Sequence, residues 1–469
     1  MEFPLFFLDL FGNRILIAVI ASVHVFINHA LAVGAYPLVA SMEWRAFRKN
    51  DAEGDELAYK ITFTLFVITT TVGALTGVGI WLTTALIAPF GIGNLLRIFF
   101  WAWFIEWLVF IGEVILIVIY FLTWKRWREG TWKKFHIGLG AFLSAFSWLT
   151  MVIIVGILGF MMNSGAWPDD RSLISGFFNP IYLPQLAFRT FYALGLAGLC
   201  VWFMLFFFTR KGTDLRSRAV RFVSLWTLAC VPPLAASSWW YWKKVPEAML
   251  ANIDVALMTQ RFAQWHETLA LIMVLAVAAI VLTALIGAVR PKILPGVALL
   301  IPFILGVWLL GHFERVREFI RKPYVIADYM YSNGVRVSDF PVFKRDGILP
   351  YTSFVKNHRV TATNQVEAGR DVFLVACSRC HTTRGLNSVA TKFRDLYGDE
   401  EWDKNVLLAF MASMHNTRTY MPPFPGNDKE AEALSAYLNY LRENPEFIFD
   451  AHTGWTDRGA AQGGGGSGP

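Results

Sequence analysis

Long apolar runs separated by short polar stretches dominate the chain up to about residue 325. A helix needs about 20 apolar residues to cross the hydrocarbon core of a bilayer. Eight segments have that length, at about 14–40, 60–88, 98–124, 137–162, 186–209, 219–241, 265–289 and 293–313. Beyond them the chain becomes polar. The pattern predicts an all-α membrane protein, an eight-helix transmembrane bundle followed by a separate helical domain.

The composition agrees with this class. The chain is 55% hydrophobic with a mean hydropathy of +0.45, well above soluble domains. Its net charge of +7 arises from Lys and Arg in short loops between apolar runs, which is typical of membrane orientation. We therefore expect membrane lipid as surroundings and no nucleic-acid partner.

Positive loops set the expected orientation, because Lys and Arg stay on the cytoplasmic side. The loops after the first, third and fifth segments carry four or five positive residues each: "EWRAFRKNDAEGDELAYK", "WKRWREGTWKKFH" and "TRKGTDLRSRAVR". Eight spans then put both termini on the opposite side. We expect a bacterial cytoplasmic (inner) membrane protein with its N-terminus and its C-terminal domain in the periplasm.

The polar part contains "CSRCH", with Cys377, Cys380 and His381. In CxxCH the two thiols attach to haem vinyl groups, and the histidine becomes the proximal iron ligand. A zinc site would lack ligands, because no second cysteine pair lies nearby. The motif predicts one covalent haem c. Such haem is attached outside the cytoplasmic membrane, which agrees with the orientation inferred from the loops.

The sixth iron ligand should follow some tens of residues later. Met421 lies in the proline-stiffened stretch "TYMPPFPG". Met411, Met414 and His415 compete, but "NVLLAFMASMH" has the pattern of an amphipathic helix, in which methionine is more often part of the core. We therefore predict Met421 as the ligand opposite His381.

The region 364–446 resembles a class I cytochrome c, with a helix leading into CxxCH, a methionine loop and a closing helix. Asn427 and Glu430 have the spacing of a capping box at the start of that helix. We expect a membrane haem-binding bundle at 1–326, a linker at 327–363, a cytochrome c domain at 364–450 and a tail at 451–469. The tail ends in the linker-like "GGGGSGP" and is left out of the fold argument.

Ionisable side chains at membrane depth are costly and indicate function. By the expected topology, several of them gather in the outer half of the bundle. Imidazole and carboxylate groups can ligate haem iron, and arginine suits haem propionates. The sequence therefore predicts buried haems there. His29 and His312 stay open as further ligands, and His136 is expected at the cytoplasmic interface. The gathered residues are His24, Glu106, Arg189, His266, Glu318 and Arg321.

Residues 10–326 resemble subunit I of the cytochrome bd quinol oxidases, on the stretches "VHVFINHALAVG", "FIEWLVFIGEV", "LSAFSWLTMVIIVGILGFMMNSGAW" and "REFIRKPYVI". The resemblance implies His24 as a high-spin haem ligand, Glu106 as the haem-site acid and Glu113 as the acid on the proton path. It implies Glu318 as the ligand of a high-spin haem b, with Arg321 beside it. It also implies two or three non-covalent haems, b and/or d, and a second membrane subunit like subunit II.

The sequence departs from that family at the low-spin haem b ligands and at the quinol-binding loop. Where the family has a histidine ligand of its low-spin haem b, "NPIYLPQLAFRTF" has Arg189, whose guanidinium cannot ligate iron. The second low-spin ligand, a methionine in the family, falls near His266. Only about 24 residues replace the long quinol-binding loop, and the cytochrome c domain stands in place of a ninth span.

These features predict a bd-like terminal reductase. Haem c on the outer face would pass electrons to buried haems that reduce O2 or another small oxidant, with protons from the cytoplasm. One alternative is a quinol dehydrogenase that sends electrons out through haem c. Another is a non-catalytic electron-transfer subunit of a larger complex. The redox partner would be a periplasmic cytochrome c or a quinol.

Overall fold

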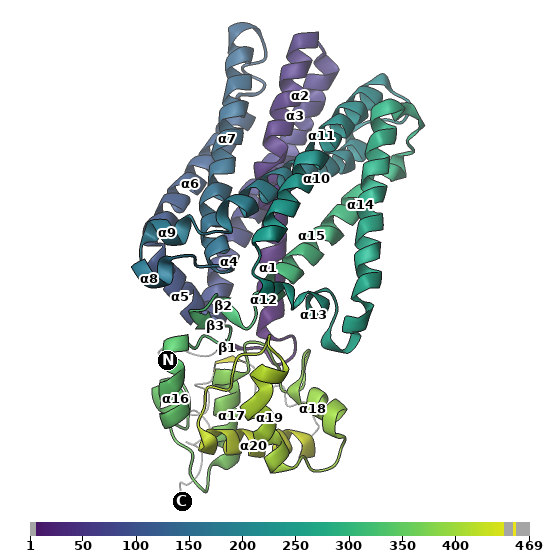
Figure 1. The fold of residues 1–469 in the computed structure, drawn as a ribbon. Coiled ribbons are helices and arrows are strands. Elements are labelled where there is room, and N and C mark those ends of the chain that lie inside the picture. The colour runs from purple at the N-terminus through teal and green to yellow at the C-terminus, as the bar shows by residue number, and fades with distance from the viewer. Residues whose placement is uncertain (1–5, 445–453, 456–469) are drawn as a thin grey trace, which may run out of the picture. The chain divides into compact units, whose positions relative to one another are not determined.

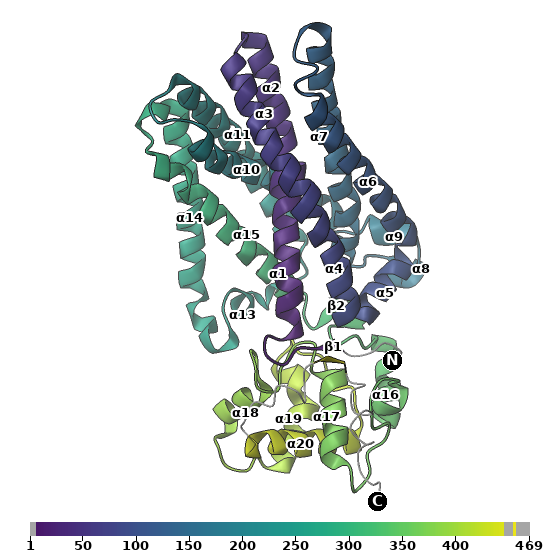
Figure 2. The same cartoon turned by 180° about the vertical axis from the view of Figure 1, so that it is seen from behind.

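The structure is a computed structural model that describes residues 6–444 and 454–455. Most of the expected tail at 451–469 lies outside the described residues. The chain forms two compact units (Figures 1 and 2). The membrane unit contains Ala21–Val78 and Ile98–Ile320, and the second unit contains Met1–Ile20, Gly79–Arg97 and Arg321–Pro469.

In the described part of the chain, eight helical segments are long and apolar enough to cross a membrane, which confirms the expected number and order. Several extend beyond the apolar runs into the charged loops. The eight segments are Asn13–Lys49 (α1 Asn13–Phe26, η1 Ile27–Val33 and α2 Ala35–Lys49), Ala52–Ile87 (α3 Ala52–Ile68, η2 Thr69–Gly73 and α4 Ala74–Ile87), α6 Phe100–Thr123, α7 Gly130–Phe160, α10 Tyr182–Phe208, α11 Asp214–Lys244, Gln260–Val289 (η3 Gln260–Trp265 and α14 His266–Val289) and Gly296–Ile320 (η5 Gly296–Leu299 and α15 Ile301–Ile320).

Short helices connect these spans. Two of them lie between α7 and α10, and the connection from α11 to α14 holds two more before η3. The latter is the stretch where the resemblance leads one to expect a long quinol-binding loop. The short elements are α8 Trp167–Asp170, α9 Leu173–Phe177, α12 Glu247–Leu250, α13 Ile253–Leu257 and η4 Pro291–Ile293.

Helix α10 is the most buried span and packs along α11 and η1 (Figure 1). Small residues allow this close approach, as is usual between membrane helices. At Gly34 an added Cβ would lie 2.2 Å from the carbonyl oxygen of Ala193, and at Gly198 it would lie 2.2 Å from Thr227 Oγ1. Both η1 and η2 are π-helical. Such π-bulges are frequent at functional sites.

The second unit has its core between helices α17 Gln365–Ala376 and α20 Asp428–Glu443, which pack against each other. At Gly369 an added Cβ would lie 1.9 Å from the carbonyl oxygen of Ala433, so only glycine permits this packing. The predicted capping box of Asn427 and Glu430 is confirmed. The other elements of this unit are β1 Phe6–Phe7, α5 Pro89–Ile98, β2 Tyr324–Ile326, β3 Met330–Tyr331, η6 Val337–Asp339, α16 Phe340–Asp346, η7 Leu349–Tyr351, α18 Val389–Tyr397, α19 Lys404–Thr417 and β4 Gly454–Trp455.

Two small antiparallel sheets complete the second unit. Strand β1 pairs with β4, and β2 pairs with β3. The stretch expected as a linker at 327–363 contains α16 and contributes Phe343, Ile348 and Leu349 to the core of the domain. Two backbone N–H groups of this stretch, at Ile348 and Leu349, donate to the buried Glu430 carboxylate. The stretch is therefore packed as part of the second unit.

Candidate functional site

The CxxCH motif forms one tight turn at the end of α17. The Cys377 N–H donates to the carbonyl of Phe373 at 2.9 Å, which continues the helix by one residue. The N–H groups of Cys380 and His381 both donate to the carbonyl of Cys377, at 3.1 and 3.0 Å. Neither cysteine is in a disulfide. Two free thiols and an imidazole on one turn are the groups that covalent haem attachment needs.

His381 is held from its Nδ1 side. That nitrogen lies 3.4 Å from the carbonyl oxygen of Asn387, a residue with φ of +64°. A bond of this kind fixes the ring and the tautomer of a metal-binding histidine, leaving Nε2 for iron. Desolvation by burial, helped by the charge of Lys392, lowers the pKa of His381 to about 4. The imidazole is therefore neutral near pH 7, which is the form that binds metals.

Met421 lies in the turn after α19, half-buried and followed by two prolines. Its N–H donates to the carbonyl of Arg418 at 2.7 Å, and its carbonyl accepts a hydrogen bond from His415 Nδ1 at 2.6 Å. Both backbone groups are thus fixed while the thioether remains available. Met411 is 4% exposed in the core of the domain, which confirms the expectation for that helix. The surroundings fit Met421 as the second axial ligand.

In the membrane unit, His24 lies on α1 against the second span. Its Nδ1 is 3.3 Å from Thr76 Oγ1, and a Cβ added at Gly77 would be 3.2 Å from its Cε1. Close contact with a glycine leaves this ring little freedom. Glu318 ends the apolar helix α15 in its last turn, and the buried Arg321 follows it in the chain.

Glu106 and Glu113 occupy the same helix, α6. Glu106 is half-buried and Glu113 is 4% exposed. Seven residues of helix separate them by about 10 Å along the axis. Glu113 lies near Ser147 on α7. Within the part of the chain that the structure describes, neither Glu113 Oε1 nor Ser147 Oγ makes a hydrogen bond of regular geometry. A buried acid with an open oxygen fits a group that exchanges protons or contacts a bound molecule.

Arg189 belongs to a buried network that the sequence did not predict. Its guanidinium lies 2.9 Å from His29 Nε2 and donates to Glu314 Oε1 at 3.3 Å. Arg317 binds the other oxygen of Glu314 at 2.8 and 3.0 Å. His29 stands on the π-helix η1, while Arg189 and Glu314 come from α10 and α15. The position expected to face a haem propionate therefore carries an internal ion network, with Arg189 only 1% exposed.

His266, at the start of α14, has contacts on both ring nitrogens. Nε2 lies 3.4 Å from Asp254 Oδ1, and Nδ1 lies 3.0 Å from the carbonyl oxygen of Ala263. Both partners belong to the connection before α14. Arg189 cannot ligate iron. Of the two expected low-spin positions, only His266 carries a group that can bind iron, and its role as a ligand stays a prediction.

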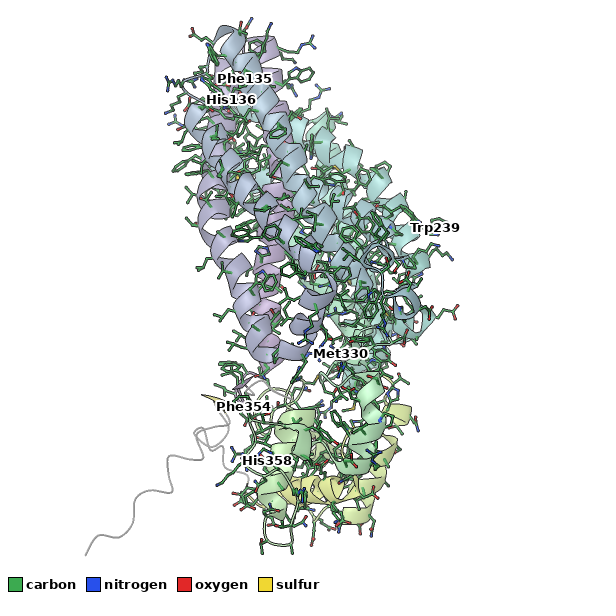
Figure 3. All side chains as sticks on the ribbon, turned by 90° about the vertical axis from the view of Figure 1, so that its left-hand side faces the viewer. Phe135, His136, Trp239, Met330, Phe354 and His358 are labelled. Atoms are coloured by element: carbon green, nitrogen blue, oxygen red, sulfur yellow. The ribbon has the colours of Figure 1, made fainter. Side chains whose placement is uncertain are left out.

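A second buried network occupies the other end of the membrane unit. Lys133 Nζ lies 2.7 Å from Glu43 Oε1 and 2.6 Å from Asp55 Oδ1. His136 Nδ1 lies 2.6 Å from Glu43 Oε1, and the Tyr120 hydroxyl donates to Glu43 Oε2 at 2.8 Å. His136 is fully buried among these side chains, and Figure 3 shows it near one end of the membrane helices, so its place at the cytoplasmic interface stays a prediction. Its charged partners on other helices compensate the burial.

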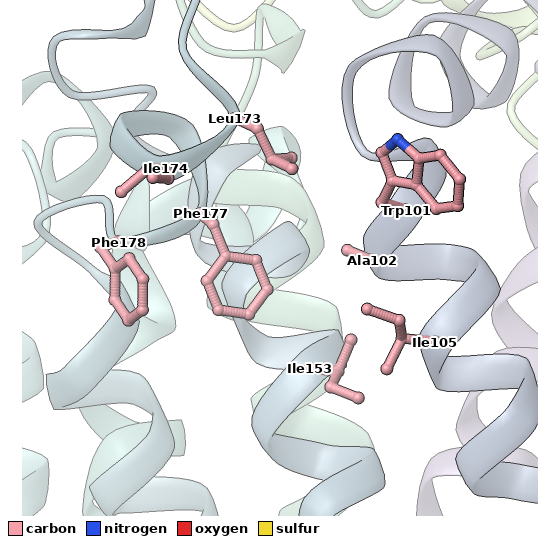
Figure 4. A pocket seen from close by; sticks show the side chains of 8 residues that line it. All are labelled: Trp101, Ala102, Ile105, Ile153, Leu173, Ile174, Phe177 and Phe178. Carbon is pink, nitrogen blue, oxygen red and sulfur yellow. The ribbon is translucent and has the colours of Figure 1, made fainter.

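An apolar pocket lies between α6, α7 and α9 (Figure 4). Ile105 lies on its wall, directly before Glu106 in the chain. The lining offers no titratable or metal-binding group, so it supplies shape but no chemistry. The lining residues are Trp101, Ala102, Ile105, Ile153, Leu173, Ile174, Phe177 and Phe178.

Comparison with known proteins agrees with the division into a membrane unit and a C-terminal cytochrome c domain. Residues 364–438 match the family model described as "Cytochrome C oxidase, cbb3-type, subunit III". No curated protein matches the chain. Among solved structures, the bd oxidase from Geobacillus thermodenitrificans is similar over 67% of this chain and 87% of its own, with 18% identity and a TM-score of 0.55. The protein therefore combines membrane helices with the fold of a bd oxidase and a C-terminal cytochrome c domain.

Proposed function

We propose that the protein is a respiratory terminal reductase of the bacterial inner membrane, in which haem c delivers electrons to haems inside the bundle. The observation that carries this proposal is the CxxCH turn, attached in one chain to membrane helices with a bd oxidase fold. Bound haems would store the electrons and bind the oxidant, and O2 is the proposed acceptor. The orientation with haem c in the periplasm rests on the charge of the loops.

The residues at the expected low-spin, quinol-linked haem positions favour electron entry through haem c. Arg189 and His266 are both bound to protein groups, and the connection from α11 to α14 consists of short helices. These contacts support a proposal in which the features that serve quinol oxidation in the resembled family are replaced. The cytochrome c domain supplies an electron carrier on the same chain.

His24 and Glu318 are the proposed iron ligands in the membrane unit, with Arg321 as a partner for a haem propionate. Glu106 is the proposed acid at the reducing site. A carboxylate there would hold a proton close to the bound oxidant and release it as charge develops. Histidine and glutamate provide the nitrogen and oxygen donors that haem iron accepts.

Proton uptake is proposed to begin at the buried network around Glu43. Tyr120 donates to Glu43, and the ring of Tyr36 packs edge-on against Tyr120 with centroids 6.3 Å apart. Glu113 lies further along the bundle and faces Ser147. These hydroxyl and carboxyl groups can pass protons from the cytoplasmic end towards Glu106, with water bridging the wider gaps.

Oxygen consumption by the purified protein tests this function. With reduced cytochrome c as electron donor, we expect oxygen uptake that is lost in a Cys377→Ser variant, while ubiquinol or menaquinol alone supports none. Reduction of haem c by quinol without oxygen uptake would instead establish a quinol dehydrogenase. Absence of both activities in the presence of any co-purifying second membrane subunit would favour a non-catalytic electron-transfer role.

A further inference from the structure

The segment that precedes the first membrane helix is built into the second unit. Phe7 is 1% exposed, and its ring packs edge-on against Phe373 of α17 with centroids 6.0 Å apart. Asn13 fastens the segment to the first turn of α1, because its Nδ2 donates to the carbonyl of Phe6 at 2.7 Å and its Oδ1 accepts from the Leu8 N–H at 3.0 Å. Phe7 of this segment is therefore part of the core of the second unit.

Asp9 makes the strongest contact of this segment. Its carboxylate is 1% exposed and accepts from the Thr383 N–H at 2.5 Å and from Thr383 Oγ1 at 2.6 Å. Thr383 is itself fully buried and stands two residues after His381. A buried carboxylate is tolerated where it receives such hydrogen bonds, and bonds to an ionised acceptor are stronger than neutral ones.

Backbone contacts extend the same attachment. The Leu386 N–H donates to the carbonyl of Leu10 at 3.0 Å. At Gly385 an added Cβ would lie 1.8 Å from the carbonyl oxygen of Asp9, so these two segments of the chain meet at a distance that only glycine allows. On the other side of this loop, the carbonyl of Asn387 holds the His381 ring. The loop thus joins the N-terminal segment to the iron ligand.

A second element of the unit also contacts the domain. Helix α5, which follows the second span, makes two contacts with the C-terminal part of the second unit. Tyr329 donates to Asn94 Oδ1 at 3.2 Å, and the Arg379 guanidinium lies 5.5 Å above the ring of Phe90. Arg379 stands between the two cysteines of the motif. The haem-attachment turn is therefore bound to two chain segments that lead into membrane helices.

We propose that Asp9 is a positioning residue that clamps the haem c attachment loop to the start of the first membrane helix. The clamp would hold the haem-attachment loop at one distance from the start of α1, so that the loop does not move independently of this helix. The inference rests on the proposed function only in requiring that haem c exchanges electrons with haems in the bundle, in either direction. Removing both charge-assisted bonds should lower the ratio of clamped to released loop about a hundredfold or more.

The first test compares Asp9→Ala with Asp346→Ala. Asp346 is an exposed aspartate of the same unit whose carboxylate accepts hydrogen bonds from the side chains of Arg345 and Tyr351. We expect Asp9→Ala to keep the haem c spectrum but to slow electron equilibration between haem c and the membrane haems about tenfold or more. Asp346→Ala should equilibrate at the original rate. An unchanged rate in Asp9→Ala would overturn the proposal.

A second test remains valid if Asp9→Ala fails to mature. The Leu10→Cys/Leu386→Cys pair places thiols on two exposed neighbours across the backbone hydrogen bond. On mild oxidation we expect near-complete disulfide formation and electron equilibration at the original rate. Slow, partial cross-linking, or a rate that falls on oxidation and recovers on reduction, would show a moving loop. Loss of oxygen uptake with normal equilibration would refute the proposed function and leave the clamp standing.

Discussion

Replacement of Arg189 by leucine tests the buried network directly. The guanidinium holds His29 at 2.9 Å and Glu314 at 3.3 Å, with 1% of its surface exposed. In Arg189→Leu the ring of His29 loses its Nε2 contact. Glu314 keeps two hydrogen bonds from Arg317 and so is not left without a charged partner.

Breaking a buried ion pair from one side typically costs about 3–5 kcal/mol. Because Arg317 still compensates Glu314, we expect the lower end, a loss of about 3 kcal/mol in the free energy of unfolding. The surface pair of Arg218 with Asp51, at 3.2 Å and with Arg218 43% exposed, provides the matched control. Arg218→Leu should cost about 0.5 kcal/mol or less.

Thermal unfolding in detergent micelles, followed by loss of the membrane-haem absorbance, measures both variants under identical conditions. We expect Arg189→Leu to unfold at a clearly lower temperature than Arg218→Leu, with the content of covalent haem c unchanged. Equal unfolding temperatures would refute the view that this network stabilises the bundle. A low-spin haem signal that is present in the unmodified protein and absent only in Arg189→Leu would show that this site holds a haem.

Three further substitutions probe other parts. His24→Ala should remove a high-spin haem signal and leave haem c intact; unchanged membrane-haem spectra would contradict this ligand. Met421→Leu should convert haem c to a high-spin form, seen in its optical spectrum, whereas Met411→Leu in the core should not. Lys133→Met should lower the unfolding free energy by about 3 kcal/mol, because Glu43 loses a buried positive partner; an unchanged melting temperature would count against it.

The transmembrane segments were predictable because length and hydropathy decide them locally. All eight expected spans are found, and the polar ends of α7 and α11 extend further only because helices continue past the apolar core. The haem c turn was predictable for the same reason. Five consecutive residues define its chemistry, and the preceding helix α17 places them on one turn.

Contacts between distant helices were not predictable from the sequence. Arg189 meets partners 160 and 125 residues away, and a π-helix determines which way His29 faces. His136 has the pattern of an interfacial residue, since it follows two lysines and an aromatic residue. Its burial depends on Glu43 from another span, which only the packing of α2 against α7 brings near.

The Asp9 contact shows a similar limit. An isolated aspartate ahead of an apolar run reads as part of a loop, and its partner Thr383 is 374 residues away. One signal was present, because "TTRG" follows the haem motif and its glycine marks a close approach of backbones. The sequence did not identify which segment of the chain approaches this glycine.

Reaction of the fully reduced protein with O2 in a stopped-flow spectrometer tests the central claim most directly. The haems of the bundle should be oxidised first, and haem c should follow through intramolecular electron transfer, with oxidation of both complete in a single mixing experiment. Persistently reduced membrane haems, or haem c that is oxidised only by an added external acceptor, would contradict a terminal reductase fed by its own cytochrome c domain.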